Sequence, residues 1–194
     1  MAGFRVGVLS EKLRSSFLKV NRLSEAEIVA GCQGGERQCQ DALVKIFAPY
    51  LFTICKRYTK NSYLADDALQ ETFIRVFKYI KNYKGQGDLR AWLRKVAITT
   101  SLQTIQHPTY RDYQDLDDWE SAELPVAVSQ FSAEEILELI EKLPEGYRTV
   151  FNLYVIDGYQ HREIAELLQI SESASRSQLA RARKYLIQLL TTNE

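Results

Sequence analysis

The sequence predicts an all-α protein of two small helical domains, joined by an acidic flexible linker, with a helix-turn-helix in the second domain. Apolar residues recur three and four positions apart along most of the chain, which is the spacing of one face of an α-helix. No segment alternates between apolar and polar residues for long, as a half-buried strand would. From residue 108 to 131 the helical spacing is lost, and Pro108, Pro125 and a series of acids stand there instead. We therefore expect a domain on each side of this linker.

The first domain, residues 23–107, is expected to hold four helices. The first begins at Ser24, because Glu27 follows three residues later and the two can form a capping box. The second carries an apolar stripe that ends at Tyr58, and Pro49 is expected to kink or break it. The remaining helices of this domain are expected at about 64–79 and from 89 onward, separated by a loop that contains Gly85 and Gly87.

The second domain, residues 132–194, is expected to begin with another capping box, formed by Ser132 and Glu135. Its strongest signal is a helix over 161–168, a three-residue turn and a last helix that ends near residue 190. Ala165 is small enough for two helices to approach each other, and Ile170 can fill the turn. This pattern indicates a helix-turn-helix, although an ordinary helical hairpin with a solvated basic face is the simpler alternative.

Charge is distributed unevenly although the net charge is zero. Residues 75–95 contain seven basic residues and one acid, and residues 173–190 contain four basic residues and no acid. The compensating acids lie between them, so two basic patches flank an acidic stretch. Residues 1–22 carry five basic residues and one acid, and are expected to form a basic N-terminal extension. Two basic patches are the pattern expected of a protein that binds nucleic acid at two places.

Several functional classes are disfavoured. The three cysteines, Cys32, Cys39 and Cys55, are an odd number and favour small core or surface residues in a reducing cytoplasm over a disulfide framework. With only His107 and His161 as histidines, neither a metal site nor a cofactor is expected. There is no glycine-rich phosphate loop, and neither histidine has an evident nucleophile partner, so an enzyme is not expected. No apolar run approaches the roughly 20 residues that a membrane span needs, so no membrane insertion is expected.

The last helix carries the candidate duplex-DNA contacts. Ser171 is expected to cap it, which leaves its N-terminal turns to enter a major groove. The residues expected to be exposed there are Ser173, Ser175, Arg176 and Ser177. Further along, the cations suited to phosphates are Arg181, Arg183 and Lys184.

These motifs resemble a known family. The segment from Leu143 through the helix-turn-helix to Leu186 is similar to the C-terminal promoter-binding domain of extracytoplasmic-function RNA polymerase sigma factors, which belong to the sigma-70 family. Independently, Asp66–Phe77 resembles the helix of that family that binds polymerase, and Leu89–Ala97 resembles the start of the helix that reads the −10 element. The resemblance extends over about residues 24–190, with the motifs in the family's order.

The resemblance implies two binding sites in the first domain. Asp67, Gln70 and Glu71 would dock on the largest subunit of polymerase, whereas the helix dipole alone would explain an acid at 67 but not Gln70. The loop from Tyr83 to Asp88 would capture a base flipped from the non-template strand, unless it is a simple turn. The residues expected to contact the −10 region are Lys78, Lys81, Tyr83, Arg90, Trp92, Arg94 and Lys95.

The implied function is promoter recognition and transcription initiation in the cytoplasm, with core RNA polymerase, promoter DNA and an anti-sigma factor as partners. One segment departs from the family, which usually continues after position 97 with an Arg-Asn pair, an Asp and a basic cluster. Here Ile98, Thr99, Gln103, Ile105, Gln106 and His107 stand instead. This departure leaves open an alternative, a sigma-like decoy or adaptor that binds an anti-sigma factor or polymerase without efficient −10 recognition. A regulator with the helix-turn-helix alone would leave the motif at 66–77 unexplained.

Overall fold

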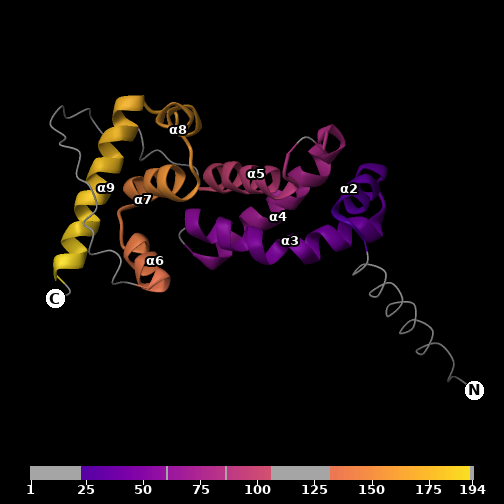
Figure 1. The fold of residues 1–194 in the computed structure, drawn as a ribbon, viewed down its shortest axis with the longest axis horizontal. Helices are drawn as coiled ribbons and strands as arrows, with labels where there is room; N and C mark the ends of the chain where they lie inside the picture. The colour runs from indigo at the N-terminus through magenta and orange to yellow at the C-terminus, as the bar shows by residue number, and fades with distance from the viewer. Residues whose placement is uncertain (1–22, 60, 86, 106–131, 193–194) are drawn as a thin grey trace, which may run out of the picture. The chain divides into compact units, whose positions relative to one another are not determined.

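The computed structural model describes residues 23–59, 61–85, 87–105 and 132–192, and every regular element within these ranges is helical (Figure 1). The expected all-α class is confirmed. The chain divides at Ile105 into two compact units. The expected basic extension, 1–22, and the expected linker, 108–131, lie outside the described residues. Within the described ranges, no helix combines the length and the apolar character that crossing a membrane requires.

The described part of unit 1 begins with α2 (Glu25–Gly34) and α3 (Arg37–Tyr58). The predicted capping box is present, because the Ser24 Oγ accepts from the Glu27 N–H and the Glu27 carboxylate accepts from the Ser24 N–H. The two helices pack so closely that a Cβ built on Gly31 would lie 2.2 Å from the Cys39 Sγ. Helix α3 runs through Pro49 without a break. Burial of core residues on both sides of this exposed proline, Phe47 and Leu51, offsets the missing N–H bond.

Helix α4 (Ser62–Tyr79), a 3-10 turn (η1, Ile80–Asn82) and α5 (Leu89–Thr104) complete unit 1. Asn61 caps α4 by accepting from the Leu64 N–H, and Asp88 caps α5 by accepting from the Arg90 N–H. Helices α3, α4 and α5 pack against one another, while α2 lies at one end beside η1 (Figure 1). Their shared core consists of fully buried side chains, including Leu43, Leu51, Ile54, Ile80, Leu89, Leu93 and Ile98.

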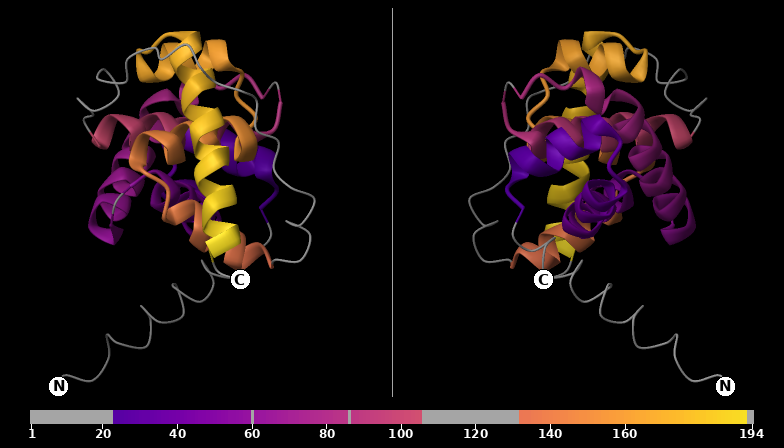
Figure 2. Two further views of the ribbon diagram at one scale, coloured as in Figure 1. Left: turned by 90° about the vertical axis from the view of Figure 1, so that its left-hand side faces the viewer. Right: turned by 90° about the vertical axis from the view of Figure 1, so that its right-hand side faces the viewer.

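Unit 2 contains α6 (Ala133–Glu141), α7 (Glu145–Phe151), α8 (His161–Leu168) and α9 (Glu172–Thr192). The predicted capping box at Ser132 and Glu135 is present. Helix α7 continues into a five-residue π-helical segment, η3 (Asn152–Ile156), which the sequence pattern did not reveal. Helix α8 crosses the N-terminal end of α9 (Figures 1 and 2). Gln169 joins them in the left-handed conformation, with φ 56°, so the predicted helix, turn and helix are confirmed.

Candidate nucleic-acid and protein interfaces

One surface of α4 presents the residues expected to dock on polymerase. Asp67 and Gln70 are exposed and lie three residues apart, on one side of the helix. Glu71 is half-buried, and its Oε1 lies 2.8 Å from the Nε of Arg75 in an ion pair one turn along the helix. Arg75 also donates to Gln103 of α5. Glu71 is therefore partly engaged inside unit 1, while Asp67 and Gln70 are available to a partner.

Two large apolar side chains extend this surface and were missed from the sequence. Tyr63 is 84% exposed and Ile74 is 61% exposed. Because residues 63, 67, 70 and 74 are separated by four, three and four positions, they form one stripe along α4. The same spacing was readable in the sequence, but the motif drew attention only to Asp67, Gln70 and Glu71. We call Tyr63, Asp67, Gln70 and Ile74 the α4 stripe.

The loop after η1 is held in a defined conformation. The Tyr83 hydroxyl donates to the Gly87 carbonyl at 2.9 Å, and the Tyr83 ring lies 5.2 Å from the Trp92 ring, centroid to centroid. Gly85 and Gly87 have φ of 67° and 101°, which side chains with a Cβ rarely adopt. Tyr83 is half-buried, and burial, followed by the charges of Glu25 and Asp88, raises the pKa of its hydroxyl. The hydroxyl therefore stays protonated and remains a donor.

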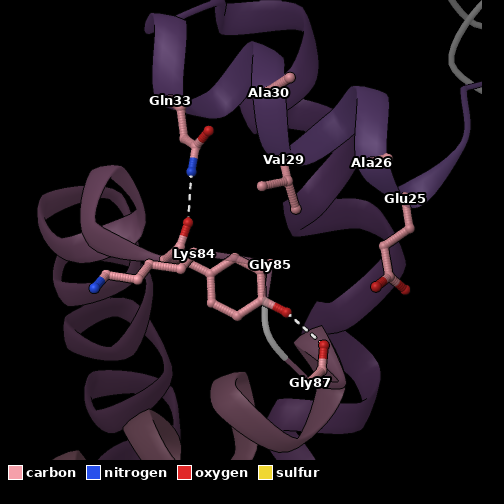
Figure 3. Close-up of a pocket in the computed structure, with 9 residues that line it drawn as sticks. Glu25, Ala26, Val29, Ala30, Gln33, Lys84, Gly85 and Gly87 are labelled. Carbon is pink, nitrogen blue, oxygen red and sulfur yellow. Dashed lines mark hydrogen bonds between the residues drawn. The ribbon is translucent and has the colours of Figure 1, made fainter.

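This loop and α2 enclose a pocket of about 350 Å³, which we call the loop pocket (Figure 3). Its volume lies in the range of small-molecule sites. It is lined by Glu25, Ala26, Val29, Ala30 and Gln33 of α2 and by Tyr83, Lys84, Gly85 and Gly87 of the loop. Gln33 connects the two walls, because its Nε2 donates to the carbonyls of Tyr83 and Ile80. The sequence reasoning identified the loop but not α2, since no motif there marks a site.

A second hollow of about 260 Å³ lies between α4 and α5. It is lined by Arg75, Tyr79, Trp92, Lys95, Val96, Thr99 and Thr100. Tyr83 lines the loop pocket and Trp92 lines this hollow, so the contact between their rings separates two neighbouring depressions. Aromatic walls with nearby cations are suited to unstacked nucleotides.

The predicted cations of unit 1 do not all face solvent equally. Lys78, Lys81 and Lys95 are exposed, and the Lys78 ammonium lies 5.4 Å from the Tyr79 ring centroid. The Arg90 guanidinium lies 4.0 Å above the Tyr50 ring, a cation–π contact that orients it toward α3. Arg94 is half-buried. Arg90 is exposed as well, so the accessible phosphate partners of this predicted set are Lys78, Lys81, Lys95 and Arg90.

The structure explains the departure after position 97 at one of its positions. Ile98 is fully buried, so its side chain belongs to the core of unit 1 and that position has no access to DNA. Thr99 is half-buried and donates to the Lys95 carbonyl at 2.9 Å, and Gln103 accepts from Arg75. Gln106 and His107 lie outside the described residues. The substitution at position 98 therefore removes no DNA contact from this fold.

The N-terminal end of α9 is the candidate duplex-DNA surface. The predicted cap is present, because the Ser171 Oγ accepts from the Ala174 N–H at 2.9 Å. Ser173 is exposed, but the expected exposure of Ser175 and Ser177 is wrong. Ser175 is fully buried and Ser177 is only 6% exposed. In the case of Ser175, α8 covers this end of α9, and His161 lies against the serine.

The cations of α9 differ in how they are held. The Arg176 Nη2 lies 2.7 Å from the Glu172 Oε2, in a half-exposed ion pair within the first turns of the helix. Arg181 and Arg183 are half-buried, and Lys184 is exposed. Of the DNA contacts predicted on this helix, those that are exposed or only partly buried are Ser173, Arg176, Arg181, Arg183 and Lys184.

His161 has a serine partner that sequence reasoning did not find. Its Nδ1 lies 2.9 Å from the Ser175 Oγ, and its ring stacks on Tyr154 with centroids 4.5 Å apart. Burial lowers the pKa of His161, as do the nearby charges of Arg176 and Arg183, whereas Glu172 acts in the opposite direction. Ser175 is fully buried and His161 is half-buried. The contact joins α8 to α9 and has a structural role.

All three cysteines are free and buried. Burial raises the pKa of the Cys32 thiol to about 11, with smaller contributions from Cys39 and Glu36. Burial also raises the pKa values of Cys39 and Cys55. These thiols are therefore protonated at neutral pH. Among the residues that the structure describes, no three His, Cys, Asp or Glu side chains are grouped as a metal site would require.

Comparison with known proteins assigns the chain to a family. The model of sigma-70 region 2 matches residues 43–107, and the model of sigma-70 region 4 matches residues 133–186. The chain is 25% identical over 175 residues to the RNA polymerase sigma-H factor of Pseudomonas aeruginosa, covering 82% of this chain and 90% of that protein. It is 25% identical over 178 residues to the ECF RNA polymerase sigma-E factor of Escherichia coli, covering 84% and 92%.

Two solved structures are also similar. CnrH, in complex with the cytosolic domain of CnrY, is 21% identical, and the alignment covers 86% of this chain and 97% of that one with a TM-score of 0.48. The sigma factor RpoE of Bartonella quintana, in complex with the anti-sigma factor NepR, is 17% identical, and the alignment covers 79% and 98% with a TM-score of 0.48.

The two family matches together span more than half of the chain, in the order in which the sequence motifs were found. The chain belongs to the sigma-70 family of RNA polymerase sigma factors. Within that family it is an extracytoplasmic-function factor, the class to which its sigma-E relatives belong.

Proposed function

We propose that this sigma factor divides its work between its units: unit 1 binds core polymerase and the −10 strand, and unit 2 reads the −35 duplex. The observation that carries the proposal is the arrangement of unit 1. One helix, α4, presents a partly apolar exposed stripe, and the same helix and α5 form the hollow that Trp92 lines. A single small domain thereby offers both a protein-docking surface and a nucleotide-sized depression.

The α4 stripe is the proposed polymerase contact. Tyr63 and Ile74 would supply apolar area, and Asp67 and Gln70 would supply polar contacts between them. Interfaces derive most of their affinity from a few such side chains near the centre of the patch. Glu71 contributes less in this proposal, because it is already paired with Arg75.

The proposed path of the single strand crosses the two depressions of unit 1. One flipped base would enter the loop pocket beside Tyr83, and a neighbouring nucleotide would lie in the hollow beside Trp92. Exposed Lys78, Lys81 and Lys95 would neutralise phosphates along this path. Arg90, which is also exposed, would add a further cation beside Tyr50, whereas the half-buried Arg94 would mainly shape the surface.

In unit 2, α9 would enter the major groove with its N-terminal turns. Ser173 and Arg176 are proposed to face bases, and the guanidinium of Arg176 suits the O6 and N7 acceptors of guanine. Arg181, Arg183 and Lys184 would contact phosphates further along the helix. Ser175 and Ser177 are not proposed as direct DNA contacts, because they are buried.

Further elements of the proposal follow from the family. The protein would act without covalent chemistry, in the cytoplasm, where its three protonated thiols match a reducing compartment. An anti-sigma factor would be a further partner. The decoy alternative is not favoured, because the match to sigma-70 region 2 extends to residue 107 and so includes the altered segment, in which Ile98 is a core residue.

The experiment that tests the −10 assignment separates DNA melting from polymerase binding. Tyr83→Ala and Trp92→Ala proteins, each reconstituted with core polymerase, should bind the core normally and yet open promoter DNA poorly. Opening is measured by the reactivity of unpaired thymines. Lys56→Ala, at an exposed position of α3, is the control and should open DNA like the wild type. Normal opening by both aromatic variants would overturn the assignment.

A further inference from the structure

The side-chain amide of Gln33 has one chemically permitted orientation. Its Nε2 lies 2.9 Å from the Tyr83 carbonyl oxygen and 3.1 Å from the Ile80 carbonyl oxygen. An amide nitrogen has two hydrogens, and these two acceptors use both. Rotating the amide by half a turn would place its oxygen against two carbonyl oxygens, which repel it. The backbone of the loop therefore determines where the Gln33 Oε1 points.

That oxygen is a free acceptor at the loop pocket. Gln33 lines the pocket, and its Oε1 makes no hydrogen bond to any residue that the structure describes. Figure 3 shows the oxygen turned away from the bond to the loop, while the Lys84 side chain extends to the side opposite α2. Glu25 adds a carboxylate to the α2 side of the pocket. The polar groups that α2 contributes to this pocket are thus acceptors.

An acceptor-rich pocket discriminates among flipped bases. Cytosine, adenine and guanine each carry an exocyclic amine that can donate to a single oxygen on the Watson–Crick edge. Thymine carries no amine there, and its ring N–H is flanked by two carbonyl oxygens that would approach the same acceptors. Leaving a buried acceptor unsatisfied carries a cost in affinity.

We propose that Gln33 is a specificity-determining residue: it accepts a hydrogen bond from the exocyclic amine of the base in the loop pocket and so disfavours thymine. This inference rests on the proposed function, because it assumes that the pocket takes a flipped base. It adds a residue of α2, which carries no recognisable motif, to the reading of the promoter. The contact also makes recognition depend on loop position, since the same amide holds Tyr83 and Ile80.

The test uses the full chain with core polymerase and synthetic fork-junction DNA. The preferred single-stranded sequence is first selected from a randomised pool. Each selected position is then replaced by the other three bases, by an abasic site, or by an analogue that lacks only the amine, namely purine for adenine or 2-pyrimidinone for cytosine. At the position that enters the pocket, removing the amine should weaken wild-type binding by about fivefold to tenfold, the worth of one hydrogen bond.

The matched variants are Gln33→Met, which keeps the chain length without hydrogen-bonding groups, and Gln38→Met, an exposed glutamine on α3. The Gln33→Met protein should bind DNA with the natural base and DNA with the amine-free analogue equally well. Its affinity should still fall when that position is an abasic site. Gln38→Met should behave as the wild type. An amine effect that persists in Gln33→Met would overturn the inference. The inference would also be overturned if an abasic site no longer weakened DNA binding by the Gln33→Met protein. That result would mean that Gln33 only holds the loop in place.

A different result would remove the proposed function of the pocket itself. If no single-stranded position of the wild-type complex is sensitive to an abasic site, no base enters the pocket, and the inference fails with it. If an abasic site weakens binding but thymine is accepted as well as cytosine or adenine, the pocket assignment stands and the role of Gln33 is overturned.

Discussion

Arg176 cannot contact DNA through its full guanidinium while it is paired with Glu172. The pair is half-exposed and spans one helical turn, so it stabilises the helix by only about 0.3–0.5 kcal/mol. In the proposed complex, DNA would displace Glu172 easily, but the carboxylate would stay close to the phosphates. Glu172 would thereby limit the affinity of α9 for DNA.

We predict that Glu172→Gln strengthens the binding of duplex DNA about twofold or more, because it frees Arg176 and removes a negative charge. Arg176→Ala should weaken binding to the preferred −35 sequence by about 1–3 kcal/mol. Its affinity for a scrambled duplex should change little. Fluorescence anisotropy with the two duplexes measures both effects. Equal losses on both duplexes would show that Arg176 contacts phosphate instead of a base.

Acidification should destabilise unit 2 through His161. Its pKa in the folded protein is lowered from the ordinary 6.5, first by burial and then by Arg176 and Arg183, against the opposing effect of Glu172. Below about pH 6.5, the unfolded chain therefore binds more protons at this residue than the folded chain does, and the free energy of unfolding falls as pH falls. Above that pH, the residue contributes no pH dependence.

The test of this prediction is the thermal midpoint of the wild type and His161→Phe between pH 5 and pH 8. Phenylalanine can still stack on Tyr154 but cannot titrate. The midpoint of the wild type should fall more steeply on acidification than that of the variant. Parallel curves would show that protonation of His161 does not change the stability of the fold.

Side-chain exposure was the least predictable property at the scale of single residues. The capping role of Ser171 followed from its place in the sequence, because an N-cap depends only on neighbouring residues. The burial of Ser175 could not be predicted in the same way, because it depends on α8, which crosses the same end of α9. The exposure of Tyr63 and Ile74 was not predicted either, because apolar spacing alone does not show which side of a helix its neighbours cover.

At the scale of elements, the close packing of α2 on α3 depends on a glycine. A Cβ at Gly31 would overlap the Cys39 sulfur and reach within 2.8 Å of the Cys39 Cβ. Gly31→Ala should therefore destabilise unit 1 by about 1–3 kcal/mol. Gly34→Ala, three residues along the same helix and with no atom within 4 Å, is the matched control and should lose no stability. Urea denaturation of both variants measures the difference, and equal stability would refute tight packing at this site.

The α4 stripe makes a prediction about affinity for polymerase. Tyr63→Ala and Ile74→Ala should each weaken binding to core polymerase about tenfold, because exposed apolar side chains become buried in a docked complex. Folding should be unaffected, since both are mostly exposed in the free chain. Ile46→Ala, at an isoleucine of α3 that is 51% exposed, is the control. Competition against a labelled sigma factor for core polymerase measures all three, and an equal effect of Ile46→Ala would remove the stripe's special role.

Helix positions followed from the sequence where a cap and apolar spacing agreed, as at the start of α2 and α6, and where the helix-turn-helix pattern marked α8. Two features did not follow from the sequence, because packing decides both: the π-helical segment η3 and the passage of α3 through Pro49. The pattern of a 3.6-residue repeat does not distinguish a widened turn from a regular one. A proline inside a strong apolar stripe likewise leaves open whether burial on both sides outweighs the lost hydrogen bond.

At the scale of the whole molecule, each of the two units carries a separate sequence signal. The helix-turn-helix alone would have indicated a generic DNA-binding protein, and the α4 motif alone would have indicated a protein-binding helix. Their order along one chain identified the family from the sequence. The loop pocket required the structure, because α2 and the loop are about fifty residues apart and meet through Gln33.

Promoter-dependent run-off transcription tests the central claim most directly. Core RNA polymerase is combined with the purified chain and templates that carry the selected promoter, and transcripts are mapped at their 5′ ends. We predict transcripts with one defined start that depend on the chain, on the −10 and −35 sequences, and on Tyr83 and Trp92. A chain that binds core polymerase but produces no chain-dependent transcript would contradict this account and identify the protein as a decoy.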